Sequence, residues 1–95
     1  MDQQTGEWTF LTNHARVLMA IAREPSARIR DLAAICRITE RTAQKIISDL
    51  EGAGCLSRTR DGRRTTFILH LEGGLRHPAE AHVPVRRLVE LLKLS

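Results

Sequence analysis

The sequence is short of aromatic residues and has no long apolar run, and both shortages limit the classes of protein that it can be. Phe and Trp together make up 3% of the chain and Tyr is absent, so the core must be mostly aliphatic, which suits packed helices. The longest uninterrupted apolar run, Val17 to Ala22, is far shorter than the ~20 residues that a membrane span requires. The opening letters MDQQTGEW lack the basic and apolar regions of a secretory signal. We therefore expect a cytoplasmic protein with no membrane partner.

Cysteine is also scarce, which argues against a disulfide framework. Cys36 and Cys55 lie 19 positions apart, and no CxxC motif is present. Such usage is typical of reduced thiols in the cytosol. We expect both side chains to act as small buried hydrophobic groups, and a thiol switch is the alternative.

The residues that would support a metal site or catalysis are sparse. His77 and His82 flank Glu80, but Pro78 opposes the helix that would align them, and third and fourth ligands are missing. The sequence contains no phosphate-binding glycine loop, nucleophile elbow or paired-carboxylate arrangement. We expect no metal site, no cofactor and no enzymatic activity.

Positive charge, in contrast, is in excess and is concentrated in the middle of the chain. The formal net charge is +4, and residues 23–64 hold ten Lys or Arg against six acids. A basic surplus of this kind favours a polyanionic partner such as nucleic acid. At 95 residues the chain has the length of one domain, so we expect residues 1–95 to form a single domain.

Apolar periodicity and capping residues predict four helices. The first begins at Asn13 as its cap and ends by Glu24, because Pro25 disfavours helical geometry in the residue before it. The others span about residues 29–36, 39–51 and 84–94, with Thr39 capping the third and Pro84 opening the fourth.

The helix at residues 39–51 has two distinct faces. Its apolar side chains fall in one arc, and its polar side chains fall in the opposite arc. The apolar arc contains Ala43, Ile46, Ile47 and Leu50, and the polar arc contains Arg41, Gln44, Lys45 and Ser48. With the preceding helix and a three-residue turn, this is the spacing of a helix-turn-helix, whose second helix enters the major groove of DNA. An ordinary amphipathic surface helix is the alternative.

The stretch LAAICRITERTAQKIISDLEGAGCL resembles the winged helix-turn-helix regulators, and among them the small MarR-like regulators of actinobacteria. The matching positions are Leu32, Ala33, Ile38, Thr39, Leu50, Gly54 and Leu56. The resemblance implies a mainly α fold with a small β-hairpin wing. Two positions depart from the family pattern. Arg37 replaces the usual turn glycine, so either it adopts a left-handed conformation or the turn differs. Ile35 replaces a polar residue, which suggests contact outside the domain's own core.

The stretch SRTRDGRRTTF predicts the wing, at residues 56–70. Asp61 and Gly62 between threonine-rich flanks favour a type I′ hairpin turn. With these two residues as the loop, Arg60 pairs with Arg63, Arg58 with Thr65 and Leu56 with Phe67, while Arg64 lies on the reverse side. Opposed like charges destabilise a hairpin unless an anion separates them, so we expect the arginines to meet DNA phosphates. A solvated hairpin that prevents edge-to-edge aggregation is the alternative.

These elements together predict a transcriptional regulator that binds double-stranded DNA in a sequence-specific way. We expect such a protein to be cytoplasmic and associated with the nucleoid. The expected DNA-binding residues are Thr39, Arg41, Thr42, Gln44, Lys45, Ser48, Arg58, Arg60, Arg63 and Arg64. Hydroxyls and wing arginines are expected to hold phosphates, and Arg41, Gln44 and Lys45 to reach base edges. The competing hypothesis is a winged helix that binds protein instead of DNA.

The two ends of the chain are expected to form a homodimer, since helix-turn-helix proteins commonly read two half-sites. Residues 1–12 would form an arm, and the helix at residues 84–94 aligns Val85, Leu88, Val89 and Leu92. Trp8, Phe10 and Ile35 are candidates to join the seam. The alternative is that the last helix folds back on the first.

Overall fold

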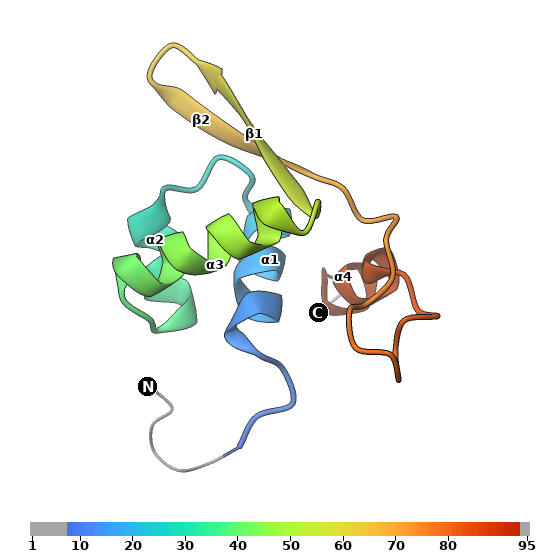
Figure 1. Cartoon of the computed structure of the whole chain (residues 1–95). Helices are drawn as coiled ribbons and strands as arrows, with labels where there is room; N and C mark the ends of the chain where they lie inside the picture. The colour runs from blue at the N-terminus through green and yellow to red at the C-terminus, as the bar shows by residue number, and fades with distance from the viewer. Residues whose placement is uncertain (1–7, 94–95) are drawn as a thin grey trace.

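The computed structural model of the chain describes residues 8–93 and has the expected winged helix-turn-helix architecture. Its elements are α1 (Asn13–Arg23), α2 (Ile29–Cys36), α3 (Glu40–Gly52), β1 (Leu56–Asp61), β2 (Arg64–Leu69) and α4 (Val85–Lys93). Three helices pack together, and the β1–β2 hairpin projects beyond them as the wing (Figure 1). The mainly α fold class with a small hairpin is confirmed. No helix within residues 8–93 has the length and apolar character needed to cross a bilayer.

The start of α1 differs from the expectation by one residue. Thr12, not Asn13, is the cap, and its hydroxyl accepts a hydrogen bond from the backbone N–H of Ala15 at 3.2 Å. The Asn13 side chain instead accepts from the Arg16 guanidinium at 2.8 Å. Thr and Asn can both cap a helix. Thr12 is the cap because it is the last residue with an extended backbone before the helix begins at Asn13.

The helix-turn-helix follows the sequence closely. Helix α2 has the expected bounds, and Asp31 in its first turn accepts from the backbone N–H of Arg28 at 3.4 Å. Arg37 lies in the left-handed region, with φ 59° and ψ 46°, so the first of the two alternatives for the turn is the observed one. The Thr39 hydroxyl then caps α3, accepting from the backbone N–H of Thr42 at 3.0 Å.

The register of the wing differs from the expectation by two residues. Asp61 pairs with Arg64, Arg60 with Thr65 and Arg58 with Phe67. The three predicted pairings, Arg60 with Arg63, Arg58 with Thr65 and Leu56 with Phe67, are therefore wrong. The turn is centred on Gly62 and Arg63. The predicted type I′ turn is also wrong, because only Gly62, with φ 65°, has a positive φ in the hairpin. Positive φ at the first central residue alone fits a type II′ turn.

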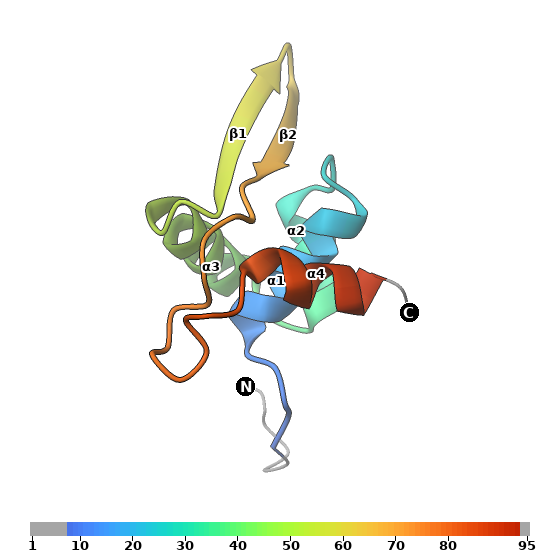
Figure 2. The ribbon, with the colours of Figure 1, turned by 90° about the vertical axis from the view of Figure 1, so that its right-hand side faces the viewer.

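The core lies between α1, α2 and α3, and α4 closes one side of it. Val17, Ile21, Leu32 and Ile47 are completely buried. Val85 and Val89 of α4 belong to the same cluster, and α4 packs against α1 (Figure 2). The fold-back alternative for this helix is thus observed within the chain. Residues 1–7 of the predicted arm and Leu94 of the predicted helix lie outside the described residues.

Candidate nucleic-acid interface

The outer face of α3 presents the polar arc expected from its sequence. Arg41, Gln44, Lys45 and Ser48 are all exposed, whereas Ala43, Ile46, Ile47 and Leu50 are buried. The apolar arc holds the helix on the core, and the opposite arc faces solvent. At the start of the helix, the Thr39 hydroxyl donates to the Thr42 hydroxyl at 3.0 Å, so these two residues form one capping unit.

Asp49 organises the C-terminal half of this face. Its carboxylate pairs with the Lys45 ammonium at 2.9 Å and with the His14 ring of α1 at 2.9 Å. Hydrogen bonds from His14 and then Lys45 lower the pKa of Asp49 below its ordinary value. Because the pairs are exposed, their main effect is to orient Lys45 rather than to stabilise the fold. Asp49 was absent from the residues expected at the site.

Arg58 anchors the wing to α3. Its Nε donates to Glu51 Oε2 at 2.6 Å and its Nη2 donates to Oε1 at 3.1 Å. The guanidinium also lies 5.7 Å from the centre of the Phe67 ring, within the range of a cation–π contact. The hydrogen bond lowers the pKa of Glu51 and raises that of Arg58. Its expected phosphate contact stays a prediction, because the side chain already has an acidic partner.

The other three wing arginines are exposed and have no acidic partner among the described residues. Arg60 Nε donates to the carbonyl of Gly62 at 3.3 Å, within the turn. Arg63 lies in the turn itself, and Arg64 opens β2 on the same face as Asp61. The wing tip is therefore a small basic surface, as expected, but its arginines do not oppose one another across the hairpin.

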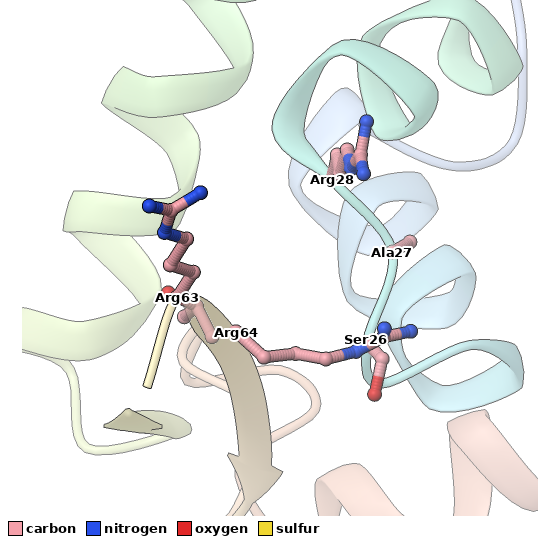
Figure 3. A pocket seen from close by; sticks show the side chains of 6 residues that line it. Ser26, Ala27, Arg28, Arg63 and Arg64 are labelled. Carbon is pink, nitrogen blue, oxygen red and sulfur yellow. The ribbon is translucent and has the colours of Figure 1, made fainter. Parts of the chain in front are cut away.

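A further basic surface lies where the wing meets the start of α2, and we call it the α2–wing cleft. It has a volume of about 380 Å³ and is lined by Ser26, Ala27, Arg28, Arg63, Arg64 and Thr65. Figure 3 shows the Arg64 side chain extending toward Ser26 across the cleft. Ser26 and Arg28 were absent from the expected site. The signal that could have found them is the basic stretch SARIR at the expected start of the second helix.

The residues considered for metal or thiol chemistry do not form a site in the described part of the chain. No group of three or more His, Cys, Asp or Glu side chains gathers there. His77 Nδ1 instead accepts a hydrogen bond from the backbone N–H of Ala79 at 3.0 Å. Cys36 is buried, which raises the pKa of its thiol, and Cys55 is half-buried.

Comparison with known proteins adds a family and two structural neighbours. A sequence model described as the MarR family matches residues 9–64. The crystal structure of MepR, a transcription regulator of the Staphylococcus aureus multidrug efflux pump MepA, has a TM-score of 0.58 at 18% identity, covering 98% of this chain and 62% of that one. The PcaV transcriptional regulator from Streptomyces coelicolor, solved with its natural ligand, has a TM-score of 0.57 at 26% identity, covering 88% and 61%. This chain thus spans about three fifths of the length of both structures. No curated protein matches it.

Proposed function

Because this chain belongs to the MarR family, we propose that it is a transcription regulator that binds double-stranded DNA and acts without catalysis, in the cytoplasm. The observation that carries the proposal is the exposed polar arc of α3, which lies on a core-docked helix beside a basic wing. In a helix-turn-helix, this arc is the part that enters the major groove.

Within the interface, we assign contacts by the chemistry of each side chain. Arg41 and Lys45 suit guanine, and Gln44 suits adenine, so these residues read bases. Ser48 and the Thr39–Thr42 unit hold phosphates beside the groove. The DNA phosphates are contacted by the exposed wing arginines, Arg60, Arg63 and Arg64. Arg58 instead fixes the wing relative to α3.

We infer that the regulator acts as a homodimer. Val85 and Val89 are used inside the chain, so the seam must come from other apolar groups. Trp8, Phe10, Ile35 and Leu91 are all largely exposed, by 65% or more. Trp8 and Phe10 also form an edge-to-face pair with ring centres 4.8 Å apart, and an exposed aromatic surface of this kind suits an interface. Sedimentation velocity at micromolar concentration should give a dimer, and a monomer throughout would contradict the inference.

The function is tested by fluorescence anisotropy with a pool of random duplexes at two salt concentrations, followed by sequencing of the tightest-bound fraction. A regulator of this kind should lose affinity steeply with salt and enrich a palindrome whose half-sites lie about one helical turn apart. Absence of binding at low salt would contradict it.

Two variants separate base reading from backbone contact. Arg41→Ala should weaken binding to the selected sequence by about 1 to 3 kcal/mol and leave random DNA almost unaffected. Arg63→Ala should weaken both by similar factors, because a phosphate contact carries no sequence information. Equal losses on both DNAs for both variants would refute the assignment.

The second candidate is a protein-interaction module, which the exposure of Ile35 favours. Its side chain is 65% exposed on α2, beside a small apolar hollow of about 130 Å³ that includes Met19 and Cys36. This candidate is favoured if the wild-type protein binds no DNA at low salt and Ile35→Lys remains dimeric, because Ile35 would then serve neither DNA binding nor the dimer seam.

A further inference from the structure

The α2–wing cleft has the charge of an anion-binding site. Arg28, Arg63 and Arg64 line it, no acidic side chain does, and none of the three has an ion-pair partner among residues 8–93. Asp31, the acid in the first turn of α2, accepts from the Arg28 backbone and not from its guanidinium. The fold therefore gathers like charges from two elements without a counter-ion, an arrangement that an anion would relieve.

The walls of the cleft are held together by hydrogen bonds. The backbone N–H of Phe67 in β2 donates to the carbonyl of Pro25, in the α1–α2 connector, at 2.9 Å. The hydroxyls of Ser26 and Thr66 lie 3.5 Å apart beside it. The two walls that carry the arginines are thus held in place before any ligand arrives, so less ordering is required when one binds.

The cleft is large enough for a hydrated phosphate group. Its volume of about 380 Å³ is many times the ~10–15 Å³ that one water needs on the same measure. It also lies at the N-terminal end of α2, where the helix dipole favours negative charge.

The position of the cleft connects it to the recognition helix. An adjoining hollow is lined by Arg28, Arg30 and Arg58 together with Glu40, the first residue of α3. A group held in the cleft therefore lies beside the end of α3 that is expected to enter the major groove. The strand of DNA that borders this groove would run past the same point.

We propose that the α2–wing cleft binds one backbone phosphate of the DNA duplex, held between Arg28, the N-cap residue of α2, and Arg64 of β2. The proposal rests on the proposed function and adds a contact that fixes how deeply α3 enters the groove. The ligand of the cleft is a phosphodiester group of the DNA, and free inorganic phosphate is the alternative ligand with similar chemistry.

Salt dependence tests the proposal with matched arginine variants. Each phosphate neutralised contributes about 0.9 to the slope of log affinity against log salt. Arg28→Ala and Arg64→Ala should each lower this slope by about one and weaken all sequences alike. Arg87→Ala is the control, because Arg87 is exposed on α4 and does not line the cleft. Thermal melting of each variant confirms that it is folded.

A scan of neutral methylphosphonate linkages through the selected duplex then locates the contact. One linkage should weaken the wild-type protein several-fold but have no further effect on Arg28→Ala. The proposal is overturned if the wild type binds DNA and Arg28→Ala behaves like Arg87→Ala. It is equally overturned if inorganic phosphate titrates the Arg28 and Arg64 resonances while no linkage depends on Arg28. A wild type that binds no DNA refutes the proposed function itself.

Discussion

The pairing of Arg58 with Glu51 decides between two roles for the first wing arginine, and one substitution tests it. If Arg58 anchors the wing, Glu51→Gln loosens the hairpin and weakens both the fold and DNA binding. If Arg58 instead contacts phosphate, Glu51→Gln releases it and removes a negative charge near the DNA, so affinity rises. The two roles therefore predict changes of opposite sign in DNA affinity.

The size of the stability effect follows from the exposure of the pair. The side chains of Arg58 and Glu51 are 42% and 30% exposed, so solvent screening limits the ion pair to about 0.2 to 1 kcal/mol. The contact with Phe67 adds about 0.5 to 1 kcal/mol. We expect about 0.5 kcal/mol for Glu51→Gln and about 1 kcal/mol for Arg58→Ala. At roughly 4 to 8 °C per kcal/mol for a domain of this size, the melting temperatures should fall by about 2 to 4 °C and 4 to 8 °C.

The pH dependence supplies an independent check. The folded pKa of Glu51 is lowered, so its contribution to stability is fully present above about pH 4.5, its ordinary value, and is lost as the pH falls through the folded pKa. Wild type and Glu51→Gln should therefore differ in melting temperature at pH 7 and converge in acid. Glu90→Gln, an exposed position on α4, is the control. An unchanged melting temperature together with tighter DNA binding by Glu51→Gln would refute the anchoring role.

Two further predictions follow from the backbone and the thiols. Arg37→Gly should stabilise the protein by about 0.5 to 1 kcal/mol in thermal melting, because the strain that glycine relieves at φ 59° exceeds its extra cost in chain entropy. The control, Arg30→Gly inside α2, should destabilise the protein by about 1 kcal/mol. A loss of stability in both variants would contradict the strain at Arg37. In mass-spectrometric alkylation, Cys55 should react before Cys36, because Cys36 is buried and burial raises its thiol pKa; the reverse order would contradict the packing described for α2.

The helices could be predicted well from the sequence because their signals are local. Thr39 before an amphipathic run and Pro25 after another mark helix ends through the chemistry of one or two residues. The turn at Arg37 was left open between two shapes, since a non-glycine residue at positive φ is stabilised only by the packing around it. The exposure of the polar arc of α3 was predicted correctly for the same local reason. The ion pair between Asp49 and His14 could not be predicted in this way, because His14 belongs to α1.

The register of the β1–β2 hairpin could not be predicted from local sequence signals. Moving the partner strand by two residues leaves every side chain on the same face, so period-two alternation cannot distinguish the expected register from the observed one. The faces were therefore right and the opposed arginines wrong. The observed register places Arg58 over Phe67 and within reach of Glu51, contacts that no hairpin signal contains.

The α2–wing cleft depends still more on tertiary structure. Arg28 and Arg64 are 36 positions apart and share a cleft because the connector at Pro25 is hydrogen-bonded to β2 at Phe67. The arginine cluster of the wing consequently divides by environment: Arg58 anchors the wing, Arg60 bonds the turn, and Arg63 and Arg64 face the start of α2. The charge density of the sequence indicated a polyanionic ligand. The role of each arginine, however, depends on whether the fold already supplies its guanidinium with a hydrogen-bond partner.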